Sequence, residues 1–150
     1  MIRTQLTKVY TGGTFDLFHT GHVNFLREAR KLGDHLVVAV NDDEFVAQFK
    51  RQPICTFEER FAVLQSCKYV NSVIRNIGGA NSGLTIDRVR PQIIAIGDDW
   101  KDKDYLGQLG IDQAWLDWRG IEIVYLPYTG GISTTEIIRR IVDQQTGNSN

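Results

Sequence analysis

The chain has 150 residues, a length typical of one domain with a complete hydrophobic core. Its formal net charge of −1 gives no bulk attraction for nucleic acid, and no apolar run approaches the roughly 20 residues of a membrane helix. The first residues lack the apolar stretch of a signal peptide, and Cys55 and Cys67 do not form a CxxC motif. We therefore expect one cytoplasmic domain over residues 1–150, with a polar tail from about residue 144 and no metal ligands, nucleic acid partner or membrane contact of its own.

Five segments are rich in β-branched and apolar residues, as buried strands are: residues 8–11, 35–40, 69–74, 92–96 and 121–126. Segments with helical spacing alternate with them. Two helices are predicted to start at capping-box patterns, Thr56 with Glu59 and Ser133 with Glu136. Residues 101–119 predict one or two short helices. This alternation predicts an α/β fold with a Rossmann-like, doubly wound parallel sheet of five strands.

The stretch from Gly12 to His22 joins the first predicted strand to the first predicted helix. Its glycines let a ligand approach the backbone, and the free N–H groups at a helix start attract anions. His19 and His22 lie three residues apart at that start, so their imidazoles face nearly the same side. Imidazole N–H groups can stabilise charge on phosphate oxygens during phosphoryl transfer. We therefore predict a phosphate site with His19 and His22 as its catalytic pair.

Other polar segments follow strands at the same predicted edge of the sheet. Lys50 and Arg51 form a basic loop after the second strand and can reach phosphates. Asp99 and Trp100 follow the fourth strand, where a carboxylate can accept from the exocyclic amine of a base and an indole can stack on it. A second interpretation is equally open, in which Asp98 or Asp99 caps a helix and Trp100 packs in the core.

Residues 129–135 place hydroxyl and N–H groups before the last predicted helix, which has the form of a second anion site. Plain N-capping by Ser133 explains the same residues, and the two roles are compatible because free N–H groups serve both.

The motifs GTFDxxHxGH, LGDHLVVAV, EERFAVLQSCKYVNSVI, IGDDW and VYLP-x-T-x-GISTT resemble the nucleotidyltransferase superfamily with HxGH motifs, in its cytidylyltransferase branch. They span roughly residues 8–140 and are most similar to those of the bacterial glycerol-3-phosphate cytidylyltransferases. The resemblance implies CTP as the nucleotide, Mg²⁺ bound with it, a phosphorylated alcohol as the acceptor, and a homodimer.

The motifs and the resemblance together give an expected set of site residues, with His19 and His22 as the catalytic pair. Nucleotide contacts are expected from Gly13, Thr14, Phe15, Lys50, Lys68, Asp99, Trp100, Thr129, Gly131, Ile132, Ser133, Thr134 and Thr135. Acceptor contacts are expected from Asp16, Arg51 and Tyr128.

The sequence departs from that family at several of these positions. Tyr128 and Gly130 stand where the family has arginine and glutamate, and tyrosine cannot supply a bidentate cationic fork. Lys68 replaces an arginine, and Phe49 stands where a substrate-binding lysine is expected. These departures leave the acceptor open. They also leave two alternatives: an adenylyltransferase that uses ATP with a sugar phosphate or FMN, and a nucleotide-binding regulatory module without turnover.

Overall fold

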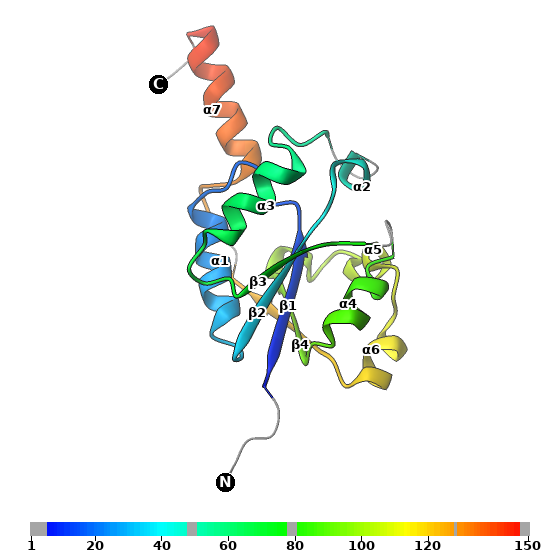
Figure 1. The fold of residues 1–150 in the computed structure, drawn as a ribbon. Helices are drawn as coiled ribbons and strands as arrows, with labels where there is room; N and C mark the ends of the chain where they lie inside the picture. The colour runs from blue at the N-terminus through cyan, green and yellow to red at the C-terminus, as the bar shows by residue number, and fades with distance from the viewer. Residues whose placement is uncertain (1–5, 48–50, 78–80, 128, 148–150) are drawn as a thin grey trace.

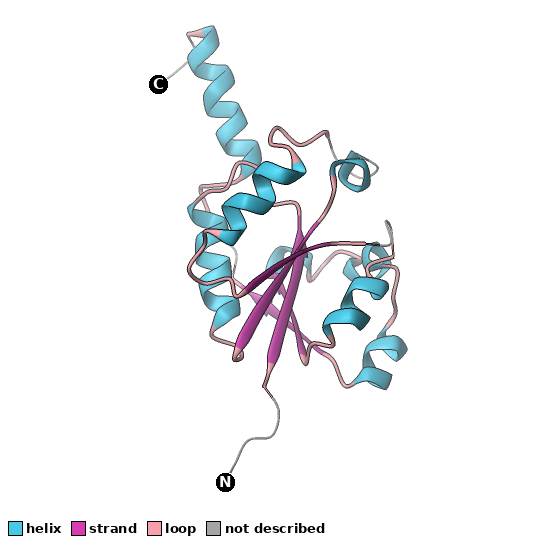
Figure 2. Cartoon of the chain, viewed as in Figure 1, coloured by secondary structure: helices cyan, strands magenta, loops and turns pink. Residues whose placement is uncertain are grey.

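The computed structural model describes residues 6–47, 51–77, 81–127 and 129–147. Five parallel strands form one sheet in the order β3-β2-β1-β4-β5 (Figures 1 and 2). The strands are β1 (Lys8–Gly13), β2 (His35–Val40), β3 (Ser72–Arg75), β4 (Ile93–Gly97) and β5 (Glu122–Leu126). This order confirms the predicted α/β fold with a doubly wound, Rossmann-like sheet.

The helices pack on both faces of the sheet. They are α1 (Thr20–Arg30), α2 (Asp43–Ala47), α3 (Phe57–Gln65), α4 (Gly83–Val89), the 3₁₀ turn η1 (Asp98–Trp100), α5 (Tyr105–Leu109), α6 (Gln113–Arg119) and α7 (Thr134–Thr146). Helices α1 and α3 cover one face, and α4, α5 and α6 cover the other (Figure 1). Helix α7 projects beyond the body of the molecule (Figure 1).

Alternate residues of the central strands enter two separate cores. Val9, Leu36 and Val38 pack with α1 and α3, whereas Tyr10 and Val37 pack with α4, α5 and α6. All five side chains are at most 6% exposed. Because successive residues of a strand point to opposite faces, burial on both faces requires the near-continuous apolar runs seen in the sequence.

The largest differences from the predicted strand boundaries lie in β1 and β3. Strand β1 continues through Gly12 and Gly13, because these residues pair with the last two residues of β2. Strand β3 begins at Ser72 rather than at residue 69. The Val70 N–H donates to the Cys67 carbonyl (3.1 Å), and this turn after α3 delays the strand.

The polar residues near the end of the chain do not form a tail within the described region. Helix α7 runs through Thr146 and ends at Gly147, which has φ +75°. The predicted tail from about residue 144 is therefore wrong for residues 144–146, whose helix continues from the preceding turns. The prediction of one or two short helices within residues 101–119 is confirmed, because α5 and α6 both lie there.

The carboxyl ends of the strands form the edge that holds the site. From β1 the chain passes to β2 on one side, while β4 lies on the other side of β1, so the connections diverge there and leave a crevice. Among the described residues, no helix combines the length and the apolar character needed to cross a membrane.

Candidate active site

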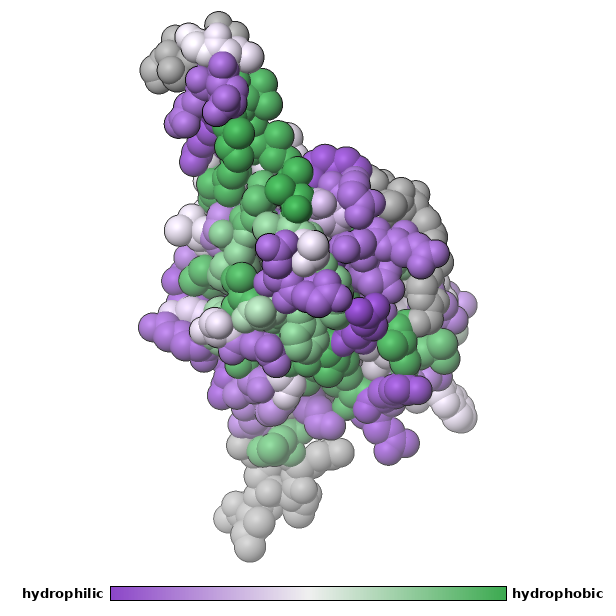
Figure 3. Space-filling view, turned by 45° about the horizontal axis from the view of Figure 1, so that its top comes forward, coloured by the Kyte–Doolittle hydropathy of each residue, from purple (hydrophilic) through white to green (hydrophobic). Residues whose placement is uncertain are grey.

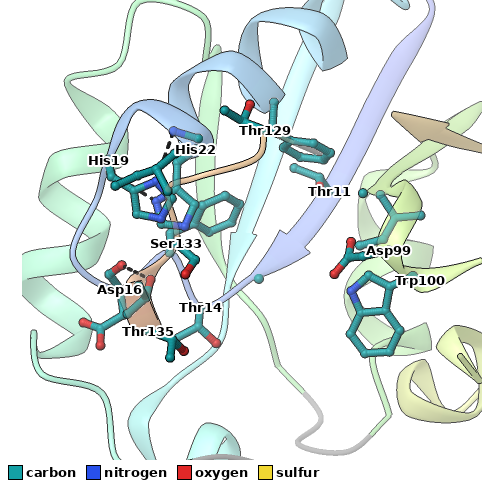
Figure 4. Close-up of a pocket in the computed structure, with 18 of the residues that line it drawn as sticks. Thr11, Thr14, Asp16, His19, His22, Asp99, Trp100, Thr129, Ser133 and Thr135 are labelled. Atoms are coloured by element: carbon teal, nitrogen blue, oxygen red, sulfur yellow. Dashed lines mark hydrogen bonds between the residues drawn. The ribbon is translucent and has the colours of Figure 1, made fainter. Parts of the chain in front are cut away.

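A cavity of about 550 Å³ lies at this crevice. It is lined by residues 11–16 at the end of β1, by the start of α1, by η1, and by the segment between β5 and α7. Figure 4 shows His19, His22 and Ser133 on one side of the cavity, with Asp99 and Trp100 on the opposite side. The structure therefore brings together segments that are more than 100 residues apart, as the motif positions predicted.

The two histidines form the start of α1 themselves. His19 is the N-cap residue, and its Nδ1 accepts from the Gly21 N–H at 3.0 Å. His22 Nδ1 accepts in turn from the His19 N–H at 3.3 Å. The two imidazoles thus play the parts that a hydroxyl and a carboxylate play in a capping box. The rings stack with centroids 3.8 Å apart, and both line the cavity.

A glycine is required at position 21, between the two histidines, for steric reasons. A Cβ atom at Gly21 would lie 2.8 Å from Cε1 and 2.9 Å from Nδ1 of His19. Any side chain there would displace the imidazole that caps the helix. The HxGH spacing is therefore a packing requirement of the histidine pair as well as a sequence pattern.

These hydrogen bonds decide which ring nitrogen carries the proton. A neutral imidazole has one donor nitrogen and one acceptor nitrogen, and Nδ1 is the acceptor in both His19 and His22. Burial, and to a lesser extent the neighbouring His19, lowers the pKa of His22 to about 3. Burial also lowers the pKa of His19. Both rings are therefore neutral near pH 7, with Nε2–H as the remaining donor.

The loop between β1 and α1 holds a strained backbone. Phe15 and Leu17 have φ of 54° and 49°, in the left-handed region that favours glycine. Between them, Asp16 is 5% exposed, and its carboxylate accepts from the backbone N–H groups of Ile54 (2.8 Å) and Cys55 (2.9 Å). These bonds tie the loop to the segment that leads into α3 and so offset the conformational cost of the strained backbone.

Asp16, expected to contact the acceptor, lines the cavity, and its hydrogen bonds give it a structural task as well. Burial alone would raise its pKa, but the N–H groups of Cys55 and Ile54 and the Arg51 guanidinium at 3.4 Å hold the pKa below its usual range. A carboxylate with these three partners orders the loop and also positions Arg51. Arg51 itself lines the cavity, as expected of a phosphate-binding residue.

Arg60 is a site residue that the sequence patterns did not reveal. It is 2% exposed, and it donates to the carbonyls of Thr14 (2.8 Å), Asn41 (2.8 Å) and Cys55 (3.2 Å). Its remaining nitrogen lies 2.5 Å from Asp43 Oδ1. Arg60 therefore joins the end of β1, the end of β2, α2 and α3 beneath the cavity. Its place inside a helix of ordinary amphipathic character gave no local signal of this role.

The start of α7 contacts the loop before α1. Ser133 caps α7 by accepting from the Glu136 N–H at 3.0 Å. The predicted capping box is only half present, because the Glu136 carboxylate pairs with Arg139 and Arg140 instead. Thr134 Oγ1 donates to the Asp16 carbonyl at 2.8 Å, across 118 positions of the chain.

The rest of the segment before α7 also reaches the cavity. Thr129, Ile132, Ser133, Thr134 and Thr135 all line it. Asn24 of α1 donates to Thr129 Oγ1 at 3.3 Å, which ties this segment to the histidine helix. The cavity wall here combines hydroxyls with the N–H groups of a helix start, which suits an anion.

Asp99 and Trp100 line the far side of the cavity. Asp99 is 43% exposed and lies 4.0 Å from the Lys103 ammonium. The N-cap residue of η1 is Gly97, and Asp99 lies inside this turn rather than before it, so the capping interpretation is wrong for Asp99. Trp100 packs against Tyr105 with ring centroids 5.3 Å apart while it faces the cavity. Trp100 therefore packs against a core residue, as the second interpretation predicted, and also presents its ring to the cavity, as base stacking would require.

Two expected residues do not join the cavity. Lys68 is exposed between α3 and β3, and its ammonium lies 5.2 Å from the Tyr69 ring. It precedes β3 in a parallel sheet, and the amino ends of the strands lie opposite the site. Gly131 has its backbone at φ +81° beside the cavity rather than in its wall. Lys50 and Tyr128 lie outside the described residues.

The other expected contacts, Gly13, Thr14 and Phe15, line the cavity as predicted, and Thr11, Gly97 and Pro127 line it in addition. These additional positions carry no distinctive side chain, so only the topology of the sheet edge could have indicated them. Among the described residues there is no group of three or more metal-ligating side chains. Any divalent cation here would depend mainly on ligand oxygens, which is how Mg²⁺ usually binds with nucleotides.

Comparison with known proteins gives one family. The family model described as cytidylyltransferase-like matches residues 10–140. The glycerol-3-phosphate cytidylyltransferase of Bacillus subtilis (strain 168) is 39% identical over 137 residues, which cover 91% of this chain and 98% of that protein. The FAD synthase of Thermococcus kodakarensis is 38% identical over 142 residues, which cover 91% and 92% respectively.

A solved structure agrees with these relatives. The lipopolysaccharide core biosynthesis protein from Thermoplasma volcanium GSS1 superposes with a TM-score of 0.68 and 29% identity, covering 83% of this chain and 98% of that one. Because the family match spans residues 10–140 and relatives align over 91% of the chain, the protein belongs to the cytidylyltransferase-like family and is a nucleotidyltransferase.

Proposed function

We propose that this nucleotidyltransferase transfers a cytidylyl group from CTP to a small phosphorylated alcohol and releases pyrophosphate. The observation that carries the proposal is the two-ended cavity. One end offers two Nε2–H donors and the start of α7, and the other offers a carboxylate beside an indole. A nucleoside triphosphate needs an anion site and a base site at opposite ends of one cleft.

In the proposed reaction an oxygen of the acceptor phosphate attacks the α-phosphorus of CTP. The bond from that phosphorus to the bridging oxygen of the β-phosphate breaks, and pyrophosphate carries away the electron pair. The acceptor phosphate is already ionised, so the site needs no strong base. His19 and His22 contribute by donating from Nε2 to oxygens that gain charge in the transition state, which requires neutral rings of the tautomer described above.

The base is proposed to lie between Asp99 and Trp100. The Asp99 carboxylate can accept from the exocyclic amine of cytosine, and Trp100 supplies a flat apolar wall. Adenine also carries an exocyclic amine, so this contact alone discriminates weakly between the two nucleotides. The family description and the Bacillus subtilis relative favour CTP.

Mg²⁺ is proposed to enter with the triphosphate, where it would neutralise charge on the leaving pyrophosphate. Arg51, which lines the cavity, is placed to share that task. We further propose a cytoplasmic homodimer, and the apolar side of α7, with Ile141 and Val142 each 51% exposed, supports association between two copies.

The experiment measures pyrophosphate release with Mg²⁺ while CTP and ATP are crossed against glycerol 3-phosphate, other phosphorylated alcohols, a sugar phosphate and FMN. The expected result is turnover with CTP and a phosphorylated alcohol. Turnover only with ATP and FMN would instead establish the second candidate, which the 38% identical FAD synthase favours. Binding of CTP without any turnover would establish a regulatory module.

A further inference from the structure

The imidazole of His22 lies against three other aromatic rings. The His19 ring is roughly parallel to it, with centroids 3.8 Å apart and an angle of 23° between the planes. The Phe18 ring is also roughly parallel, at 5.4 Å and 22°. The Phe15 ring is tilted by 58°, and its centroid again lies 5.4 Å from that of His22. Side-chain packing therefore confines this catalytic ring in addition to its hydrogen bond.

Phe18 differs from the other two rings in where it lies. His19 and Phe15 line the nucleotide cavity, whereas Phe18 does not line it and packs against the core that α1 and α3 cover. Phe18 thus connects His22 to the hydrophobic core without itself reaching the ligand. A side chain in this place has no contact to offer a substrate, so its effect on the reaction has to pass through His22.

The strained turn before α1 supplies both phenylalanine rings. Its backbone has positive φ at Phe15 (54°) and at Leu17 (49°). Asp16 anchors the turn through its two hydrogen bonds to backbone N–H groups. Left-handed residues other than glycine are costly and persist where their surroundings fix them, which is common at functional sites. The anchored turn therefore holds the two phenyl rings against His22.

Hydrogen bonding alone fixes the His22 ring weakly. Within the described part of the chain, its Nδ1 accepts from the His19 N–H at 3.3 Å, beyond the usual range of about 2.7–3.2 Å. The outer torsion of a histidine side chain has a broad energy profile, so this bond leaves the direction of Nε2–H loosely set. A catalytic group misplaced by about 1 Å can cost roughly 100-fold in rate. A flat ring packed nearly parallel to the imidazole restricts its rotation, because a tilted imidazole would collide with it.

Packing by Phe18 also affects the charge of His22. Two titratable groups act on the ring: His19 at the start of α1 lowers its pKa, and Asp16 in the preceding turn raises it. Burial has the largest effect and lowers the pKa to about 3. Without the Phe18 ring, water would reach the imidazole and the Asp16 carboxylate would favour its protonation. An imidazolium carries a proton on Nδ1 and cannot accept from the His19 N–H.

We propose that Phe18 is a positioning residue for nucleotidyl transfer, whose ring holds the His22 imidazole in the orientation that directs Nε2–H into the cavity. Phe18 occupies one of the variable positions of the GTFDxxHxGH motif, so the motif itself does not indicate this role. The inference rests on the proposed function and adds to it a residue that acts only through a catalytic side chain.

The test is Phe18→Ala, which removes the ring. The kcat of pyrophosphate release should fall roughly 10- to 100-fold while the KM of CTP stays unchanged, because no nucleotide contact is lost. The pKa of His22 should rise from about 3 toward 6.5, as measured by NMR titration of the imidazole nitrogens in the protein without substrates. Phe18→Leu again covers the imidazole with an apolar side chain and should restore most of both properties.

Phe61→Ala is the matched control. Phe61 is half-buried and packs against the same core as Phe18, but its ring lies 5.5 Å from that of Phe57 rather than beside a histidine. This variant should lower the melting temperature without changing kcat or the pKa of His22. Phe18→Val is a milder truncation, and it should show both changes even if Phe18→Ala does not fold.

Two results would overturn the inference alone. One is an unchanged kcat and an unchanged His22 pKa in the folded Phe18 variants, and the other is an equal change in Phe61→Ala. Absence of pyrophosphate release by the wild type with every pair of substrates would overturn the proposed function, and with it the catalytic part of the inference. The NMR titration would then still decide whether Phe18 controls the state of the His22 ring.

Discussion

Each of the two histidines serves the helix through one ring nitrogen and the ligand through the other. His19 Nδ1 caps α1, and its Nε2 remains for the phosphate. Truncation of the side chain, as in His19→Ala, would remove both functions. A loss of activity would then not distinguish a missing phosphate contact from a frayed helix. A substitution that separates the two functions is more informative.

His19→Asn makes that separation. Asparagine is among the best N-cap residues, so α1 and the melting temperature should be retained. The shorter side chain loses the Nε2 donor, and kcat should fall about 10²- to 10³-fold, as for removal of one transition-state donor. Pyrophosphate release measures the effect. His35→Asn is the control, because His35 bonds Ser72 near the amino end of β2 and should keep full activity.

The lowered pKa of His22 also leads to a prediction about stability. Its folded pKa of about 3 lies below the ordinary value of 6.5, so the unfolded chain binds more protons between these two pH values. The free energy of unfolding should therefore rise with pH across this window, by at most about 1.4 kcal/mol per pH unit from this residue. Urea unfolding of wild type and His22→Asn at pH 4.5, 5.5, 6.5 and 7.5 checks the slope. If the two proteins show parallel profiles, His22 is not buried as a neutral ring.

The catalytic residues could be predicted because the HxGH motif is local in sequence. The role of their Nδ1 atoms as hydrogen-bond acceptors could not be predicted from the sequence, since it depends on the path of the backbone at the helix start. Asp16 shows the same limit. Its position in the motif indicated a ligand contact, but its partners Ile54 and Cys55 come from a segment that no local pattern relates to it.

At the scale of elements, the site depends on how loops are joined beneath it. Arg60 of α3 holds three carbonyls and one carboxylate from four different segments. The planar guanidinium can serve these acceptors at once, whereas the ammonium of lysine is a single compact group. Helix α3 is thus part of the site although its side chains do not line the cavity.

Arg60→Lys should therefore destabilise the protein by about 3 kcal/mol, because buried carbonyls and the Asp43 carboxylate lose their partner. The midpoint of urea unfolding measures this change. Arg75→Lys is the matched control. Arg75 is 48% exposed and lies 3.7 Å from Asp42, so its replacement should cost less than about 1 kcal/mol. Equal effects in the two variants would show that Arg60 is not a structural centre.

The five strands and their parallel arrangement followed from the apolar runs and their alternation with helices, and one or two short helices were expected where α5 and α6 lie. The boundaries were less predictable. Glycine is generally unfavourable in strands. Gly12 and Gly13 nevertheless extend β1, because their pairing with β2 overrides this local preference. Gln144 looked like part of a polar tail, but it continues the helical turns of α7.

At the scale of the whole molecule, α7 is unusual because none of its residues is buried. Figure 3 shows an apolar stripe along this projecting helix. A helix of 13 residues with one apolar side in water is marginal alone and gains stability from a partner. The proposed homodimer would cover this stripe.

Ile141→Asp should therefore weaken the dimer and shift it toward monomer, as measured by light scattering coupled to size exclusion. The charge would have to be buried in the interface without a partner. Leu84→Asp provides the control, because Leu84 is 54% exposed on α4, which packs on the far side of the sheet. A monomeric wild type, or a dimer that resists Ile141→Asp, would exclude this interface.

The central position of β1 has a consequence for how the chain is made. Ile93, which begins β4, lies 80 residues after Gly13, which ends β1. At about 5–20 residues per second, a ribosome exposes one edge of β1 for roughly 4–16 s before the strand that covers it emerges. Nascent chains therefore carry an open, apolar strand edge through half of their synthesis. That interval is when this protein depends most on chaperones and is most exposed to aggregation.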